Sequence, residues 1–267
     1  MGGLPAADHI TVLIMENQNY LAVANAGSSY VVSALKPMSA WFDQAYAVAH
    51  KSQPDYFALF AGTTEGLSGG GQATDACRPP GAPYQGDIAA TAIASGLTFA
   101  AYVEDKIPGN ACDYPKNDPA GTPYQVNRHT PWVNFSDVPA SAIHEWPIQT
   151  VPDLSANITF LIPNQMDNSH DSSLAFGDSY LAAVVPGIVA YDASHNGLLV
   201  LLWDEAESDN TNGGGRVAVL LTGPMVSPAA YAQKIDDYSV LRTIEDMKHL
   251  PHLGLTGGTL PITGIWH

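Results

Sequence analysis

The sequence predicts an α/β fold: a three-layer sandwich in which helices cover both faces of a largely parallel sheet. Two runs, His9–Met15 and Gly197–Trp203, are almost wholly apolar, as strands buried on both faces of a parallel sheet are. Segments with helical character alternate with such strands, which is typical of this fold class. No internal repeat or linker divides the sequence, so we expect residues 1–267 to form a single domain.

The other elements are expected where apolar runs lie between turn signals or where the pattern suits a helix. The expected strands are His9–Met15, Leu97–Val103, Ile158–Ile162, Gly197–Trp203 and Val217–Thr222. The expected helices are Tyr30–Phe42, Gln53–Ala61, Asp87–Ser95, Phe176–Ser194 and Tyr238–Lys248. Residues 63–85 and 107–127 are rich in Gly and Pro, and we expect long loops there, which often carry function.

Composition and charge limit the classes of partner. Hydrophobic residues make up 46% of the chain, and 10 basic against 26 acidic residues give a formal charge of −16. This charge argues against nucleic acid or an anionic membrane surface, because both bind Lys and Arg patches. A small anionic substrate stays compatible, since a bound cation inverts the local field. The longest apolar runs are too short to cross a bilayer, so no stable membrane insertion is expected. The oligomeric state stays open.

Two cysteines, Cys77 and Cys112, lie in loop-like sequence. They are either two reduced thiols or a disulfide; we favour the disulfide, which implies an oxidising compartment. The start, Met1-Gly2-Gly3, lacks the basic and apolar regions of a signal peptide. Because the favoured disulfide implies an oxidising compartment, the expected location is secreted or periplasmic, and the chain would then be a mature form with a replaced start. A cytoplasmic location is the alternative.

Oxygen-bearing side chains follow both of the most apolar strands. Asp204 and Glu205 directly follow Gly197–Trp203, and Glu16 and Asn17 directly follow His9–Met15. The carboxyl ends of such strands are where ligands bind in open α/β sheets. Two strands ending in hard oxygen ligands predict one divalent cation between them. The Gly-rich loop at 207–215 is either a flexible surface turn or a rim beside this site.

A serine stands at the predicted start of a helix. Ser52 lies just before Gln53–Ala61, and Pro54 suits a first helical turn. One interpretation is a helix-capping serine, which is common. The other is a nucleophile whose developing charge faces free backbone N–H groups and a metal.

Six segments in chain order resemble motifs of the bacterial phosphoesterase family, which contains acid phosphatases and phosphatidylcholine-type phospholipases C. That family belongs to the alkaline-phosphatase-like superfamily. The segments, with the family motifs, are Met15–Tyr20 ("MEN-x-x-Y"), His50–Tyr56 ("H-P-S-x-P-N-Y"), Tyr124–Phe135 ("Y-x-x-x-H-N-P-x-x-x-F", here with one extra residue before the histidine), Pro163–Asp178 ("P-N-x-x-x-D-x-H-D…G-D"), Trp203–Pro224 ("D-E…N-R-x-P…G-P") and Tyr238–Asp246 ("Y-S-L-L-R-T-I-E-D"). The resemblance implies an alkaline-phosphatase-like fold.

The resemblance also implies a metal-dependent enzyme that hydrolyses phosphate esters of small substrates. Ser52 would be the nucleophile of a phosphoseryl intermediate. Three histidines would hold phosphoryl oxygens or protonate the leaving group: His50, His129 and His170. Five residues would surround the cation: Glu16, Asn17, Ser52, Asp204 and Glu205. Oxygen ligands favour Ca²⁺ or Mg²⁺, with Zn²⁺ possible.

Four residues depart from the family pattern. Asp55 replaces an Asn that would donate a hydrogen bond to the phosphoryl group, whereas an ionised Asp repels a dianion. Asp237 replaces a His, Lys51 a Pro, and Asn168 an Asp. The added negative charge is compatible with a second cation, a different substrate or reduced phosphatase activity.

Three functions therefore stand beside one another. The first is an acid-phosphatase-like phosphomonoesterase, and the second is a phosphodiesterase of the phospholipase C type. The third is a non-catalytic protein that binds a phosphorylated ligand. Retention of the nucleophile and of the ligand set argues against the third, because a degenerate site usually loses one of them.

Overall fold

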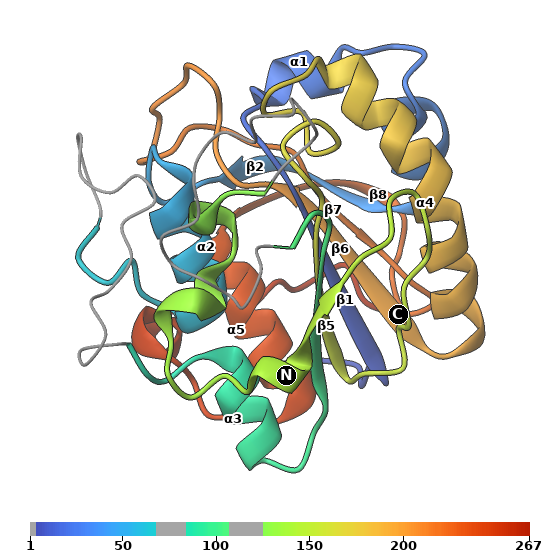
Figure 1. Cartoon of the computed structure of the whole chain (residues 1–267). Helices are drawn as coiled ribbons and strands as arrows, with labels where there is room; N and C mark the ends of the chain where they lie inside the picture. Colours follow the sequence, from blue (N-terminus) through green and yellow to red (C-terminus); the bar gives the residue numbers. More distant parts are fainter. Residues whose placement is uncertain (1–3, 68–83, 107–124) are drawn as a thin grey trace.

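A single mixed sheet organises the molecule (Figure 1). The computed structural model describes residues 4–67, 84–106 and 125–267. The strands are β1 (His9–Met15), β2 (Ala40–Tyr46), β3 (Phe99–Val103), β4 (Ile143–Glu145), β5 (Ile158–Ile162), β6 (Gly197–Trp203), β7 (Val219–Thr222) and β8 (Ala229–Asp236). Their order across the sheet is β4-β3-β5-β1-β6-β7-β2-β8. Only β7, among the described strands, runs antiparallel to its neighbours β6 and β2.

Helices cover both faces of the sheet, which confirms the predicted α/β layers. The helices are α1 (Tyr20–Ala24), α2 (Ser52–Ala61), α3 (Ile88–Ala94), α4 (Leu174–Ser194) and α5 (Asp237–Lys248). Figure 1 shows α2, α3 and α5 on one face and α4 on the other. Helix α2 packs on α5 and α3, while α4 packs on β6.

The centre of the sheet is the pair predicted from its apolar sequence. Strands β1 and β6 are parallel neighbours from His9↔Gly197 to Met15↔Trp203. Every residue of β6 is buried, as is every residue of β1 after His9. Because the two strands end at the same level, the residues that follow them leave the sheet side by side. The register therefore brings Glu16 close to Asp204.

The predicted helix Tyr30–Phe42 is wrong. One π-helical turn at Val31–Leu35 and a 3₁₀ turn at Lys36–Met38 lead directly into β2. Pro37 removes a backbone donor and limits the helix there. Trp41 and Phe42 favour a strand, and β2 gains partners in both β7 and β8.

Strands β2, β4 and β8 were not expected from the sequence. Strand β8 alternates between exposed and half-buried residues over most of its length, so it lacks the apolar run that marks a central strand. Strand β4 has three residues, of which two are exposed. The other predicted elements agree with the structure to within two residues at each end, as for Val217–Thr222 against β7.

Helix α4 is long and apolar enough to cross a membrane by length and composition alone. In the structure, its face with Tyr180, Leu181 and Val184 is buried, and the helix packs on β6. Helix α4 therefore covers one face of the sheet.

The predicted disulfide between Cys77 and Cys112 lies outside the described residues, and so does most of the two predicted long loops. The bridge therefore stays a prediction.

Candidate active site

Three carboxylates gather at the carboxyl ends of β1 and β6. The Asp204 N–H donates to the carbonyl of Met15 (3.0 Å), and the Asn17 N–H donates to Asp204 Oδ1 (3.2 Å). These bonds join the two strand ends that the sequence predicted to meet. Glu16 is fully buried, and Asp204 and Glu205 are 2% and 6% exposed.

Ser52 faces this carboxylate group from the start of α2. It is the first residue of the helix, and the extended residue Lys51 occupies the capping position. The Ser52 hydroxyl lies 3.2 Å from Glu16 Oε2 and 3.2 Å from Glu205 Oε1. Its side chain therefore contacts the strand-end carboxylates and does not cap the helix.

Burial makes these carboxylates difficult to ionise. It raises the pKa of Glu16 to about 7. Burial and the Asp204 charge raise the pKa of Glu205 to about 8, and burial and the Glu16 charge raise the pKa of Asp204 well above its ordinary value. A cation among them would favour the ionised forms, since it supplies the opposite charge that burial removes.

The donor set fits a hard cation in its chemistry. Among the described residues, no three His, Cys, Asp or Glu side chains already stand in a metal-binding cluster. Yet Asp204 Oδ2 is buried and receives no N–H or hydroxyl donor from the part of the chain that the structure describes. Glu16, Asn17, Ser52, Asp204 and Glu205 all offer oxygen, which suits Mg²⁺ or Ca²⁺.

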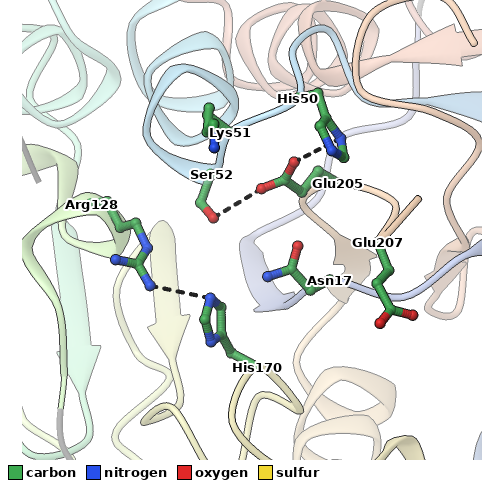
Figure 2. Close-up of a pocket in the computed structure, with 8 residues that line it drawn as sticks. All are labelled: Asn17, His50, Lys51, Ser52, Arg128, His170, Glu205 and Glu207. Carbon is green, nitrogen blue, oxygen red and sulfur yellow. Dashed lines mark hydrogen bonds and ion pairs between the residues drawn. The ribbon is translucent and has the colours of Figure 1, made fainter. Parts of the chain in front are cut away.

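A pocket of about 300 Å³ opens above Ser52. Figure 2 shows its lining residues, with Ser52 and Glu205 in contact near the centre. The lining is Asn17, His50, Lys51, Ser52, Arg128, His170, Glu205 and Glu207. The pocket therefore brings together the nucleophile candidate, two of the three predicted histidines and two cationic side chains.

Hydrogen bonds hold Arg128 and His170 against the pocket. Arg128 Nη2 lies 3.1 Å from His170 Nε2, and His170 Nδ1 lies 2.6 Å from Asp171 Oδ1 (Figure 2 shows the first contact). Because an arginine only donates, Nε2 accepts and Nδ1 carries the proton that is donated to Asp171. These contacts fix the orientation of the His170 ring beside the pocket.

His50 also belongs to the pocket, but His129 does not. His50 Nδ1 lies 3.1 Å from Glu205 Oε2. His129 is fully buried, its Nε2 is 2.9 Å from Glu16 Oε1, and its ring stacks on Tyr56 at 5.1 Å. The Tyr56 hydroxyl donates to the same Glu16 oxygen at 2.7 Å. His129 and Tyr56 therefore hold Glu16 from behind, and His129 has no place among the pocket residues where the sequence predicted a phosphoryl contact.

Asp55 is also absent from the pocket lining. Its Oδ1 accepts from the backbone N–H groups of Val48 (3.0 Å) and Ala49 (2.8 Å). Asp237 Oδ2 accepts from Val48 as well. Burial and the neighbouring Asp237 charge raise the pKa of Asp55 well above its usual range. The two departures from the family pattern thus lie together beneath the nucleophile segment.

The Gly-rich loop packs closely on the segment before Ser52. A Cβ on Gly214 would lie 1.7 Å from the carbonyl oxygen of Ala49, and one on Gly213 would lie 2.2 Å from that of Val48. Only glycine permits this approach. Glu207, at the start of the loop, lines the pocket, so the rim interpretation describes the loop better than a flexible turn.

Sequence reasoning missed Arg128 as a pocket residue and treated Lys51 only as a departure. Arg128 directly precedes His129 in the segment that resembles the family's histidine motif. A basic residue there, in a chain with few basic residues, was the available signal. Tyr56 is the last residue of the segment that resembles the family's nucleophile motif, and Glu207 begins the loop for which a rim was one interpretation.

With this geometry established, the comparisons are informative. The Phosphoesterase family model matches residues 16–251. The chain belongs to the Phosphoesterase family. The match extends from the first predicted metal ligand to beyond α5, and it confirms the resemblance seen in the sequence. The protein is a phosphoric ester hydrolase.

A relative of known activity covers almost the whole chain. The phosphatidylinositol-3-phosphatase of Mycobacterium tuberculosis is 30% identical over 269 residues, which span 98% of this chain and 84% of the relative. This similarity supports hydrolysis of phosphate esters.

Solved structures confirm the alkaline-phosphatase-like fold. A protein of the alkaline phosphatase superfamily from Vibrio parahaemolyticus has a TM-score of 0.66 at 11% identity, covering 98% of this chain and 73% of its own. The lipoteichoic acid synthase LtaP from Listeria monocytogenes has a TM-score of 0.55 at 9% identity, covering 98% and 74%. At these identities the likeness shows the fold alone.

Proposed function

We propose that this phosphoesterase is a metal-dependent phosphomonoesterase that acts through a phosphoseryl intermediate on Ser52. The observation that carries the proposal is the position of the Ser52 hydroxyl, 3.2 Å from carboxylates on two different strand ends. Ser52 also lines a pocket whose other lining residues include Lys51 and Arg128. A serine hydroxyl, a group of carboxylates and two cationic side chains thus share one small volume, which supports the proposal.

Ser52 forms a bond to phosphorus as the ester P–O bond breaks, and its hydroxyl proton leaves toward Glu16 or Glu205. The alcohol departs with a proton that His50 can deliver, because its imidazole lines the pocket and lies 3.1 Å from Glu205 Oε2. Water then cleaves the Ser52 phosphoester, releasing phosphate and restoring the hydroxyl. A cation held by Glu16, Asn17, Ser52, Asp204 and Glu205 would supply charge for the serine alkoxide and for the phosphoryl oxygens.

The charge of the rim favours a phosphomonoester. A monoester carries up to two negative charges near neutral pH, whereas a diester carries one. Lys51 and Arg128 together provide two positive charges beside Ser52, and bidentate donors such as Arg suit phosphoryl oxygens. The mycobacterial relative is a phosphatidylinositol-3-phosphatase, so a phosphorylated inositol lipid is one candidate for the natural substrate.

Hydrolysis of p-nitrophenyl phosphate and of bis(p-nitrophenyl) phosphate, each with and without EDTA, tests the proposal. A phosphomonoesterase releases nitrophenol from the first substrate, and chelation abolishes the reaction. Faster hydrolysis of the second substrate identifies a phosphodiesterase of the phospholipase C type. Hydrolysis of neither, with phosphate binding retained, identifies a non-catalytic binding protein.

A further inference from the structure

A second and larger pocket lies beside the active site. Its volume is about 570 Å³, and its lining is Asn19, Tyr20, Leu21, Ala22, Ser208, Asp209 and Arg216. The active-site pocket is lined by Asn17 and Glu207 from the same two chain segments. Neighbouring residues of the same two segments therefore line both pockets.

Two hydrogen bonds form the ridge between the pockets. Asn19 Nδ2 donates to Ser208 Oγ at 3.0 Å, and the Ser208 N–H donates to Asn19 Oδ1 at 3.2 Å. The ridge joins the loop after β1 to the loop after β6, which also carry the candidate metal ligands. The second pocket is therefore built on the same strand ends as the catalytic site.

The second pocket contains an arginine, Arg216, that forms no salt bridge within the described residues. The Arg216 guanidinium stacks over the Tyr20 ring at 3.6 Å. Its Nε is buried and has no hydrogen-bond partner within the described ranges, where no salt bridge to Arg216 occurs either. An unsatisfied donor on a buried cationic group is costly, which makes this arginine a candidate anion-binding group.

The surroundings of Arg216 fix its position. The Tyr20 hydroxyl accepts from Trp41 Nε1 (2.9 Å) and donates to Asp43 Oδ1 (2.7 Å), so the ring beneath the guanidinium is held at its far end. The backbone of Arg216 is held too, because its N–H donates to Asp209 Oδ2 at 2.9 Å and its carbonyl accepts from Tyr20. A guanidinium held in this way loses little freedom when it binds an anion.

The nearby carboxylate of Asp209 is already occupied. It accepts from the Thr211 N–H, from the Thr211 hydroxyl and from the Arg216 N–H. These bonds hold the pKa of Asp209 below its ordinary value, with the Thr211 contact as the largest cause. The Arg216 charge also lowers this pKa, but Asp209 forms no salt bridge to the guanidinium among the described residues, so the Arg216 donors stay available to a ligand.

We propose that Arg216 binds a second phosphate group, monoester or diester, on the alcohol part of the substrate. This proposal rests on the proposed function, since it places the scissile phosphate at Ser52 and the second phosphate in the neighbouring pocket. The planar guanidinium matches two phosphate oxygens at once. The preferred substrates are then phosphomonoesters that carry a further phosphate.

Matched substrates test the assignment. Glucose 1,6-bisphosphate is compared with glucose 6-phosphate, and inositol 1,4-bisphosphate with inositol 4-phosphate, by phosphate release. Arg216→Gln is expected to raise KM for the bisphosphates about 10- to 100-fold, as the loss of a charged hydrogen bond does, with kcat and the monophosphate KM changed less than about twofold. Arg216→Lys, which keeps the charge and loses the planar fork, should give an intermediate KM.

Lys234→Gln is the matched control, because it removes one positive charge from an exposed side chain outside both pockets. It should leave all four KM values unchanged. Thermal melting of each variant checks the fold. Equal effects of Arg216→Gln on the two members of each pair, or no effect on any, would overturn the assignment, and the Arg216→Lys variant decides the case if Arg216→Gln does not fold.

A binding measurement separates this proposal from the proposed function. Calorimetry with glucose 1,6-bisphosphate on Ser52→Ala, and on Ser52→Ala combined with Arg216→Gln, reports affinity without turnover. Arg216-dependent binding in a protein that hydrolyses no phosphomonoester supports the second pocket and refutes the proposed function. Hydrolysis by the wild type with no Arg216-dependent binding refutes the second pocket alone.

Discussion

The floor and the rim of the active-site pocket differ in where their charge comes from. The floor, defined as Glu16, Asp204 and Glu205, follows two central strands and is at most 6% exposed. The rim, defined as Lys51, Arg128 and His170, lies in loops and turns and is exposed or half-buried. The sheet therefore positions the acidic groups, and the loops and turns outside the sheet position the basic groups.

This difference separates two tasks. A cation and a nucleophile require fixed positions, which strand ends provide because the sheet register fixes them. Recognition of a phosphate requires positive charge that solvent and substrate can reach. Changes in the floor should therefore impair kcat and metal affinity, whereas changes in the rim should mainly raise KM.

The strongest test removes the group that links floor and rim. Ser52→Ala should lower kcat by at least about a thousandfold, because no other side chain replaces the nucleophile, and the melting temperature should change little since Ser52 is not a cap. Steady-state hydrolysis of p-nitrophenyl phosphate measures this, with the exposed Ser33→Ala as the control. Turnover that survives in Ser52→Ala would remove Ser52 from the mechanism.

The second test concerns the cation that we propose for the floor. Asp204→Asn should weaken metal affinity, and added cation should partly restore its activity, whereas no cation should rescue Ser52→Ala. Chelation of the wild type should lower its thermal stability, because a ligand at a hundred times its Kd stabilises the native state by about 2.7 kcal/mol. Unchanged melting and unchanged activity after exhaustive chelation would contradict a metal site in the floor.

The third test sharpens the role of the rim. Arg128→Gln should raise KM for a phosphomonoester about 10- to 100-fold with a smaller change in kcat, in line with about 1.5–3 kcal/mol for a hydrogen bond to a charged group. Initial rates over a range of substrate concentrations separate the two constants, and Lys234→Gln serves as the control. If kcat fell and KM did not, Arg128 would act in the chemical step and the contrast between floor and rim would fail.

The smallest effect is expected beneath the floor, at Asp55. A carboxyl whose folded pKa is raised binds a proton more tightly in the native state, so the stability of the protein falls as pH rises above the unfolded value of 3.8. Asp55→Asn cannot ionise and keeps the oxygen that accepts from Val48 and Ala49. The variant should therefore gain stability over the wild type as pH rises from about 5 to 8.

Urea denaturation at the two pH values measures this gain, and turnover should change less than about threefold because Asp55 does not line the pocket. A marked improvement in phosphomonoester turnover would instead show that Asp55 repels the substrate. The pH dependence of stability thus tests whether burial disfavours the ionised Asp55, and the turnover tests whether Asp55 acts on the substrate.

The sequence alone determined the central sheet and its acidic end. Strands β1 and β6 were predictable because burial on both faces requires an uninterrupted apolar run, and polar residues directly after such a run have no packing role. Ser52 was recognisable by its place before a helix and by family resemblance. The edge strand β8 gave no such signal, since its pairing with β2 depends on partners distant in sequence.

Tertiary structure alone decided which of two neighbours lines the pocket. Arg128 and His129 lie in one 3₁₀ turn, Asn127–His129. The fold buries His129 against Glu16 and Tyr56, and it leaves Arg128 in the pocket beside His170. Residue type favoured the histidine as the catalytic group. Adjacent side chains in such a turn project in different directions, and what each one meets is set by strands and helices far away in the sequence.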